Sequence, residues 1–268
     1  QALLSHYEKG IRECGLEFLV RAADYYGVSC DYLLGRSPDR TGAVLTVDDL
    51  PPDIYSQTRC FHTTGITLAL GEGVRSTAME MIRRFKAAGA LISFDVNFRA
   101  NLWSEAEARR YVEQILPYVD VFFCSETTAR LTFGKQGTPR EMMASFAKDY
   151  PLSIVASTHR VVHSPKRHTF GSVLYDARSG KFYEEEPYRD IDVVDRIGSG
   201  DAYISGVLYG LLCEGGDCRK ALEYGNASSA VKNTIPGDLP SCNRREIDRV
   251  YRVEQASGFV PAEQPAVQ

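Results

Sequence analysis

The segment from Asp195 to Asp201 reads DRIGSGD and stands directly ahead of an amphipathic helical pattern. Gly198 and Gly200 let the backbone turn tightly around Ser199, so that amide N–H groups at the start of the helix converge on one point. A helix N-terminus of this kind suits phosphate, because its free N–H groups and its dipole both favour negative charge. We therefore predict an anion hole formed by Gly198, Ser199 and Gly200.

Asp201 is the residue of this segment that phosphate binding does not explain, because a carboxylate repels an anion. A carboxylate at this point suits a base that takes a proton from an attacking hydroxyl group. The same hole would stabilise the charge that develops on a transferred phosphoryl group. The alternative is a glycine turn in which Asp201 only caps the helix. Because Asp195 precedes the first glycine by three residues, in a strand–loop–helix context, we favour the catalytic interpretation.

Three stretches of the chain resemble ribokinase-like (PfkB) sugar kinases, in the order in which that family carries them. DRIGSGDAYISG (195–206) is similar to the family's C-terminal signature, usually written DTxGAGD, with mild departures at the second and fifth positions. DVNFRANLW (95–103) resembles the segment after a central strand, and NASSAVKNTIPGDLP (226–240) resembles a late helix and the adenine-side loop. The Asn-Phe-Arg and Ile-Pro-Gly-Asp motifs most resemble those of 2-keto-3-deoxygluconate kinases. The resemblance covers residues 53–250.

This resemblance implies an ATP-dependent phosphotransferase with Asp201 as the base and with ATP and Mg²⁺ as cofactors. Asn97 and Arg99 would face the substrate or the phosphates, and an arginine suits a sugar-acid carboxylate because its fork binds in a bidentate manner. Thr158, expected to end a strand, would lie near the nucleotide, and Asn226 would lie near the adenosine. The plainer alternatives are a surface ion pair for Arg99 and capping or helix packing for Thr158 and Asn226.

The chain departs from the family in two respects. The family carries an N-x-x-E motif that helps to organise Mg²⁺ and phosphate, but Ser125 and Thr128 stand at the aligned positions. Glu126 is close, yet its offset points it elsewhere on a helix. We therefore predict no metal-binding residue. The family's N-terminal part, with its lid strands and main sugar-binding glycines, has no counterpart, so we expect an N-terminally truncated kinase portion.

Residues 1–42 resemble the C-terminal half of an Xre/Cro-type helix-turn-helix domain, with three short helices expected at 2–9, 15–26 and 30–34. The second helix is expected to bury one face, formed by Leu16, Leu19, Val20 and Ala23. Five basic residues against six acidic ones in 1–40 leave no positive surface for phosphates. We therefore predict that this segment does not bind DNA.

The following part alternates short apolar strands with amphipathic helices, which predicts a parallel sheet covered on both faces in a three-layer α/β/α arrangement. Strands are expected at 90–95, 119–125 and 153–158, a hairpin at 170–186, and helices at 73–88, 201–213 and 217–232. Capping boxes are expected at Ser104–Glu107 and at Asn243–Glu246. The expected domains are a partial helix-turn-helix segment (1–42), a kinase domain (53–252) and a disordered tail (253–268).

The composition is that of a globular protein, with 44% hydrophobic and 25% charged residues and a net charge of −4. This charge gives no bulk attraction to nucleic acid or to an anionic membrane. No apolar run approaches the ~18 residues of a membrane span, and the seven cysteines are scattered. We expect a cytoplasmic protein that binds no membrane, and a homo-oligomer is compatible with the sequence.

The motifs together favour ATP-dependent phosphorylation of a hydroxyl group on a sugar or sugar acid of the 2-keto-3-deoxygluconate kind. Two alternatives stay open: a sugar- or nucleotide-responsive transcriptional regulator derived from a kinase, and an inactive fragment. Asp201 favours the kinase, since a sensor needs no base. The missing lid favours either alternative.

Overall fold

The computed structural model describes three stretches of the chain, residues 16–36, 47–51 and 53–256. Contacts divide the chain into two units, Gln1–Pro51 and Pro52–Gln268. The helix expected at 2–9 and residues 257–268 of the expected tail lie outside the described residues.

The described part of the first unit contains three short helical elements: α2 (Leu16–Tyr26), α3 (Cys30–Leu33) and the 3₁₀ helix η1 (Val47–Asp49). Ser29 caps α3 by accepting a hydrogen bond from the backbone N–H of Tyr32 at 3.1 Å. A serine in this position satisfies a backbone donor that the helix itself leaves unpaired.

The face of α2 that helical spacing marks as buried is only partly covered. Ala23 is 4% exposed, whereas Val20 is 48% exposed and Leu19 is half-buried. Tyr25 also lies on the surface, 83% exposed. The expected burial of the stripe is therefore wrong at Val20, and the resemblance to a helix-turn-helix segment stays a prediction.

The second unit is built on a seven-stranded mixed sheet. Four strands are parallel, in the order β1 (Cys60–Thr64), β2 (Leu91–Asp95), β3 (Val121–Phe123) and β4 (Ile154–Ser164). The other three are antiparallel to their partners, with β5 (Arg167–Asp176) pairing with β4, β6 (Lys181–Glu184) and β7 (Tyr188–Asp192). The expected α/β fold is thus confirmed, and its parallel part ends at β4.

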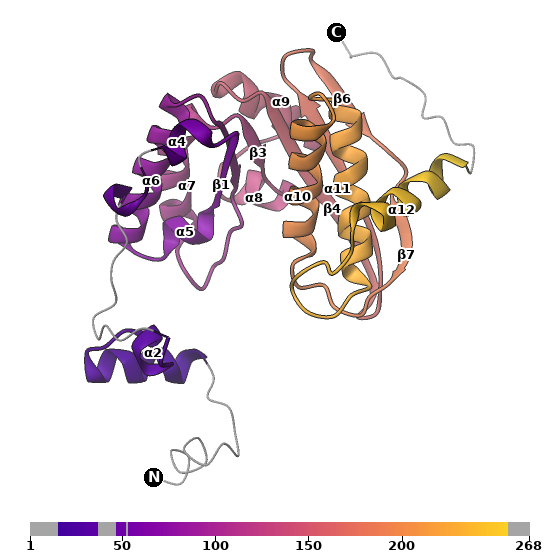
Figure 1. The fold of residues 1–268 in the computed structure, drawn as a ribbon. Helices are drawn as coiled ribbons and strands as arrows, with labels where there is room; N and C mark the ends of the chain where they lie inside the picture. Colours follow the sequence, from indigo (N-terminus) through magenta and orange to yellow (C-terminus); the bar gives the residue numbers. More distant parts are fainter. Residues whose placement is uncertain (1–15, 37–46, 52, 257–268) are drawn as a thin grey trace. The chain divides into compact units, whose positions relative to one another are not determined.

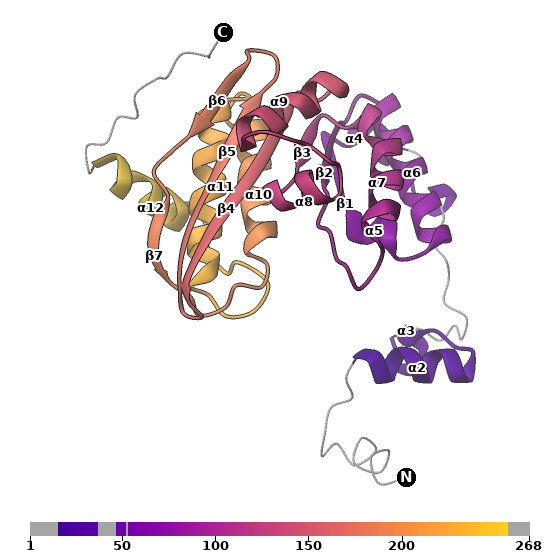
Figure 2. The same ribbon diagram turned by 180° about the vertical axis from the view of Figure 1, so that it is seen from behind.

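The sheet turns antiparallel because the link between β4 and β5 is only two residues long, which allows a hairpin but no crossover helix. β4 runs six residues past the end expected at Thr158, since His159 to Ser164 pair with β5. This extension is exposed and apolar only at Val161 and Val162, so it lacks the longer apolar run that marks a strand in sequence. Figure 2 shows β4 and β5 side by side.

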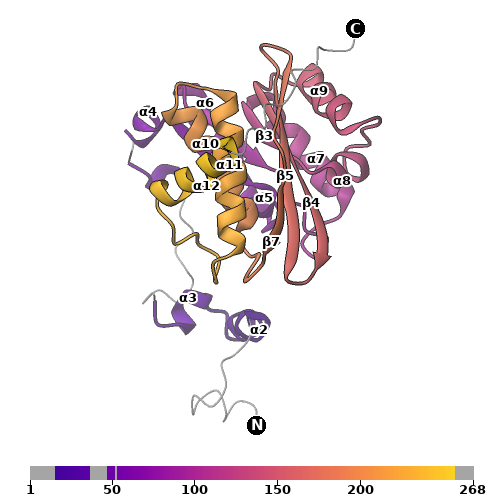
Figure 3. The same ribbon diagram turned by 90° about the vertical axis from the view of Figure 1, so that its right-hand side faces the viewer.

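Helices cover the sheet on both sides, which confirms the three-layer arrangement. The first side carries α5 (Gly65–Ala69), α6 (Glu72–Ala87), α7 (Glu105–Ile115), α8 (Glu126–Leu131) and α9 (Pro139–Asp149). The second side carries α10 (Ser199–Cys213), α11 (Cys218–Asn233) and α12 (Arg244–Ala256). The short elements α4 (Ile54–Gln57) and η2 (Leu116–Tyr118) complete the unit (Figure 1). Figure 3 shows α10 and α11 on one side of β4 and β5, and α8 and α9 on the other.

The strands feed two cores, one on each side of the sheet. On β3, Phe122 belongs to the core beneath α6 and α9, while Val121 and Phe123 belong to the core beneath α10 and α11. On β4, Val155 and Ala156 divide in the same way. Because successive side chains of a strand point to opposite faces, a strand buried on both faces is apolar at every position.

Both expected capping boxes are present. The Glu107 N–H donates to Ser104 Oγ at 3.2 Å and the Ser104 N–H to Glu107 Oε2 at 2.9 Å. At α12 the Asn243 N–H donates to Glu246 Oε2 at 2.7 Å. The helix that follows runs to Ala256, four residues into the segment expected to be a disordered tail.

The spacing of Val74, Ala78, Met81 and Phe85 predicts one buried face for the helix at 73–88, and the buried face of α6 differs from it by one position. Ala78 and Phe85 are buried as expected, but Ile82 is fully buried where Met81 was expected, and Met81 is half-buried. Both positions fit helical spacing from Ala78, so periodicity does not distinguish them. Val74, expected on the same face, is 43% exposed.

Two glycines bring α10 and α11 into close contact. A Cβ atom on Gly206 would lie 2.4 Å from the carbonyl oxygen of Tyr224, and one on Gly210 would lie 2.4 Å from the Cα of Ala221. Helical spacing predicts a buried face of Ile204, Val207, Leu208 and Leu211 for α10; Ile204 and Val207 are buried, whereas Leu208 and Leu211 are half-buried. The absence of a side chain at Gly206 and Gly210 therefore matters to the contact between α10 and α11 as much as the apolar residues do. None of the helices in the described residues has the length and apolar character needed to span a lipid bilayer.

We expect Gly206→Ala to lower the free energy of unfolding by ~1–3 kcal/mol, because the added methyl group must push α10 away from the backbone of α11. Thermal or chemical denaturation measures the change. The matched control is Gly73→Ala in α6, where a Cβ atom meets nothing within 4 Å; there we expect no loss, or a small gain from helix propensity. Equal effects of the two substitutions would contradict this account of the contact.

Candidate active site

Helix α10 begins at Ser199, two residues before the predicted start, so that Gly200 and Asp201 form part of its first turn. The Ser199 N–H donates to the Arg196 carbonyl oxygen at 3.1 Å. In the described part of the chain, the N–H groups of Gly200 and Asp201 have no protein acceptor. These two donors stand at the positive end of the helix dipole, which is the geometry required to hold an anion.

Gly198 precedes the helix in a left-handed conformation, with φ at 75°. A Cβ atom at this position would also lie 1.9 Å from the carbonyl oxygen of Asp238. The conformation and the close approach therefore both require glycine. Asp195 ties the loop that contains Asp238 to the loop before α10. Its carboxylate accepts hydrogen bonds from Ile197 N–H at 2.9 Å and from Gly237 N–H at 3.1 Å. These N–H groups hold the pKa of Asp195 below its ordinary value.

The C-terminal end of α11 carries the loop that leads to this turn. The Asn233 carbonyl oxygen accepts hydrogen bonds from the N–H groups of Val194 at 2.8 Å and Asp195 at 3.2 Å. The ammonium group of Lys232 donates to the carbonyl oxygens of Asp195 at 3.3 Å and Ile235 at 3.0 Å. The sequence did not predict these roles of Asn233 and Lys232. For Lys232, a lysine within the small-residue run of α11 is the signal that could have shown it.

A second carboxylate lies near Asp201, at the C-terminal end of β2. Asp95 is partly buried, and this burial, more than any other effect, raises its pKa to about 7. The Asn97 N–H and the charge of Arg99 lower that pKa, and the negative charge of Asp201 raises it. Burial lowers the pKa of His62, and the negative charge of Asp201 opposes this effect in part. Asp201 therefore lies within electrostatic reach of the ends of β1 and β2.

The segment after β2 turns sharply at Asn97. Asn97 has a φ of 36°, an uncommon value for a residue other than glycine, and its N–H donates to Asp95 Oδ1 at 3.2 Å. Arg99 is exposed, with Nη1 donating to the Phe98 carbonyl oxygen at 3.1 Å. The structure thus brings Arg99 and Asp201 to one edge of the sheet, where the parallel strands end and where ligands bind in open α/β folds. The sequence analysis did not identify Asp95 or His62 as members of this cluster.

Thr158 and Asn226 lie in a different setting from the one expected. Thr158 stands in the middle of β4, opposite Ser172 of β5, so the expectation that it ends a strand is wrong. Asn226 is 0% exposed. Its Oδ1 accepts a hydrogen bond from Ser172 Oγ at 2.7 Å, and its Nδ2 donates to Glu185 Oε1 at 2.6 Å. These contacts agree with the alternative of helix packing, and the place of Asn226 near the adenosine stays a prediction.

The segment at the start of α8 provides no free carboxylate. Ser125 Oγ caps the helix by accepting the Thr128 N–H at 3.2 Å, and it donates to Thr128 Oγ1 at 2.9 Å. Glu126 forms hydrogen bonds with Arg130 at 3.1 and 3.0 Å. These residues therefore stabilise α8, and they do not fit a direct Mg²⁺ site.

Two arginines that the sequence analysis did not assign lie close to each other near the turn. Burial and the charge of Arg196 both lower the pKa of Arg160, and the two arginines also contribute to a lowered pKa of His168, whose main cause is burial. Within the described residues, neither guanidinium group has an ion pair or a hydrogen-bond acceptor. Two unpaired cations, one of them in the turn that leads to α10, leave a local excess of positive charge.

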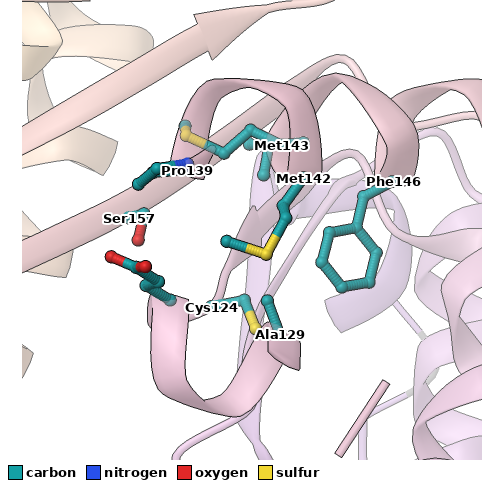
Figure 4. A pocket seen from close by; sticks show the side chains of 9 residues that line it. Cys124, Ala129, Pro139, Met142, Met143, Phe146 and Ser157 are labelled. Atoms are coloured by element: carbon teal, nitrogen blue, oxygen red, sulfur yellow. The ribbon is translucent and has the colours of Figure 1, made fainter. Parts of the chain in front are cut away.

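A small, mostly apolar pocket lies between α8, α9 and β4 (Figure 4). It is lined by Cys124, Glu126, Ala129, Pro139, Met142, Met143, Phe146, Val155 and Ser157. None of the predicted site residues is among them. Most of its lining belongs to the core on the first side of the sheet, and we assign it no ligand.

Known proteins that resemble the chain are carbohydrate kinases. The sequence profile of the pfkB family carbohydrate kinases matches residues 43–242. The chain is 33% identical over 253 residues to the 2-dehydro-3-deoxygalactonokinase of Haloferax volcanii, which covers 90% of this chain and 76% of that protein. It is 29% identical over 205 residues to the 2-dehydro-3-deoxygluconokinase of Bacillus subtilis, covering 76% of this chain and 59% of the relative.

Solved structures agree with this result. A PfkB family carbohydrate kinase from Listeria grayi superimposes with a TM-score of 0.71 at 29% identity, covering 80% of this chain and 67% of the other. For the 2-dehydro-3-deoxygluconokinase of Thermotoga maritima the TM-score is 0.70 at 28% identity, with coverages of 78% and 65%. The chain thus spans less than two thirds of several relatives. The profile match over most of the chain and the one-third identity to a named kinase show that this protein belongs to the pfkB family of carbohydrate kinases.

Proposed function

We propose that this chain transfers a phosphoryl group from ATP to a hydroxyl group of a sugar acid of the 2-keto-3-deoxygluconate or 2-keto-3-deoxygalactonate type. The observation that carries the proposal is the pair of unpaired N–H groups of Gly200 and Asp201 beside the Asp201 carboxylate. The substrate class is supported by the names of the relatives in Haloferax volcanii and Bacillus subtilis.

The N-terminus of α10 is suited to the transferred phosphoryl group. Charge on that group spreads over its outer oxygens as it moves, and preorganised N–H donors stabilise this charge without having to reorient. Arg160 and Arg196 add two full positive charges that no described acidic residue neutralises. We assign these arginines to the polyphosphate chain of the nucleotide, because guanidinium groups bind phosphate oxygens in pairs.

Asp201 is the group that removes the proton from the sugar hydroxyl. Its carboxylate is exposed and has no hydrogen-bond or ion-pair partner among the described residues. The cap position of α10 is held by Gly198, and no side chain caps the helix there. The alternative in which Asp201 serves as the cap therefore lacks the hydrogen bond that defines a cap. An unpaired carboxylate beside an anion site favours a kinase over a sensor, which needs no base.

Arg99 and Asp95 belong to the sugar side of the site in this proposal. The exposed Arg99 can bind the carboxylate of a sugar acid with its fork. Because burial raises the pKa of Asp95 to about 7, its carboxyl group can carry a proton near neutral pH. The protonated form avoids a second negative charge next to Asp201 and the phosphates.

The nucleotide, rather than the chain, is the natural carrier of Mg²⁺. The described residues contain no cluster of three or more acidic, histidine or cysteine side chains that could hold a metal ion. Magnesium commonly keeps several water ligands and is bound by substrate phosphates with few protein carboxylates. We therefore derive no catalytic step from a protein-bound metal.

The first prediction of this proposal concerns the base. Asp201→Asn should lower the rate of phosphoryl transfer by ~10²–10⁴, because it removes the proton acceptor and keeps the size of the side chain. ATP affinity should stay equal or rise slightly, since a negative charge near the phosphates is lost. A coupled kinase assay and titration calorimetry measure the two quantities. Equal turnover in the two proteins would mean that Asp201 is not the base.

The second prediction concerns the two unassigned arginines. Arg160→Gln and Arg196→Gln should each weaken ATP binding by ~10-fold, the usual effect of losing a charge-assisted hydrogen bond. Binding of adenosine, which has no phosphate, should not change. Arg189→Gln serves as the matched control, because Arg189 is exposed and already paired with Glu186 at 3.2 Å. If all three variants bind ATP alike, the arginines do not contact the phosphates.

The third prediction follows from the raised pKa of Asp95, about 7. Between the ordinary pKa of an aspartate and 7, the folded protein binds more protons than the unfolded chain, so stability falls as pH rises through this window. Asp95→Asn removes the titration. The melting temperature of the variant relative to the parent should therefore rise by several degrees between pH 4.5 and pH 8. A difference that does not depend on pH would show that Asp95 titrates normally.

A further inference from the structure

One full positive charge is buried beneath the anion hole, and the chemistry proposed above does not use it. Lys232 is 0% exposed, yet its ammonium group donates only to two backbone carbonyl oxygens, those of Asp195 and Ile235. Within the described residues no carboxylate lies within ion-pair distance of it. Lysine is almost never fully buried unless it is paired, because desolvating an ammonium group is costly.

The surroundings of Lys232 offset the cost of desolvating its ammonium group with oxygen atoms and negative charge, as the ligands of a bound cation do. The residue lies in the last turn of α11, where the carbonyl end of the helix dipole favours a cation. The Asp195 carboxylate is close enough that the charge of Lys232 helps to lower its pKa, after the effects of its hydrogen bonds to the Ile197 and Gly237 N–H groups. Carbonyl oxygens around a weakly hydrated monovalent cation are also the ligands of potassium ions.

The two carbonyl groups belong to different loops, and both loops form the anion hole. Asp195 lies in the loop between β7 and α10, which ends at Gly198, and Ile235 lies in the loop after α11, which contains Gly237. The Asp195 carboxylate accepts the Gly237 N–H at 3.1 Å, and the second loop packs against Gly198. The position of Gly198 in turn sets where the free N–H group of Gly200 points. The ammonium group is thus the common centre of the contacts that hold the hole together.

We propose that the Lys232 ammonium group acts as a built-in monovalent cation that fixes the anion hole, so that this protein needs no free potassium or ammonium ion at this point. Lys232 is a positioning residue, since it acts through the two loops and not on the substrate. The catalytic meaning of the hole rests on the proposed function, whereas the role of the buried charge in joining the loops does not.

A pair of substitutions tests this proposal. Lys232→Ala leaves a space lined by two carbonyl oxygens and near a carboxylate, which a potassium or ammonium ion can enter; Lys232→Met fills the same space with an apolar chain. In a buffer whose only monovalent cation is bulky tetramethylammonium, we expect both variants to melt at a lower temperature. We also expect faster hydrogen exchange at Ile197 and Gly237, and ~10-fold weaker ADP binding. Potassium or ammonium ions should restore most of these properties in the alanine variant and none in the methionine variant.

The parent protein supplies a further arm that needs no variant. Its melting temperature and ADP affinity should be the same in potassium, ammonium and tetramethylammonium chloride at one ionic strength. A requirement for a small monovalent cation would overturn the proposal, and so would a folded alanine variant that neither ion restores. If both variants fail to fold, the parent's response to the three salts decides. A parent that binds no nucleotide would contradict the proposed function alone, because melting and hydrogen exchange would still report on Lys232.

Discussion

The attachment of the loop before α10 to the C-terminal end of α11 is the constraint on which the site depends. The last carbonyl groups of α11 would be left without partners inside the protein, and backbone polar groups must be satisfied when they are buried. The Asn233 carbonyl oxygen meets this need by accepting the N–H groups of Val194 and Asp195. Because α11 is buried against α10 and β5, the loop inherits the rigidity of the core. The turn at Gly198 and the free N–H groups that follow it are therefore held in place before any ligand arrives.

The charges around this turn come from separate parts of the chain, and not all of them are neutralised by internal partners. The negative charge of Asp201 in α10 helps burial to raise the pKa of Asp95 at the end of β2, and the charge of Arg99 lowers it. Arg160 from β4 and Arg196 from the turn add positive charge that internal partners do not consume. An internal ion pair would have neutralised this positive charge and left none for a ligand. Leaving it unpaired preserves it for a polyanionic ligand, at some cost in repulsion between the arginines.

The differences between expectation and structure occur where a residue's partner is distant in sequence. Thr158 was expected to end a short apolar strand, but pairing with β5 extends that strand to Ser164. Asn226 was expected near the adenosine because residues 226–240 resemble the family's late helix and adenine-side loop. Only the packing of α11 on β5 shows that Ser172 and Glu185 satisfy its amide. A polar side chain in a run of small residues looks alike in sequence whether its partner is a ligand or another strand.

The sequence by itself determined the features that depend on local chemistry. It determined the glycine turn before α10, the capping boxes at Ser104 and Asn243, and the alternation of strand and helix that specifies a covered sheet, because propensity, capping and periodicity act over a few residues. Tertiary structure decided the features that depend on distant partners. It placed Asp95 and His62 beside Asp201, left Arg160 and Arg196 unpaired, and buried Lys232 beneath the anion hole. The physical reason is that burial and electrostatic interactions depend on distance in space, which short-range patterns along the chain do not encode.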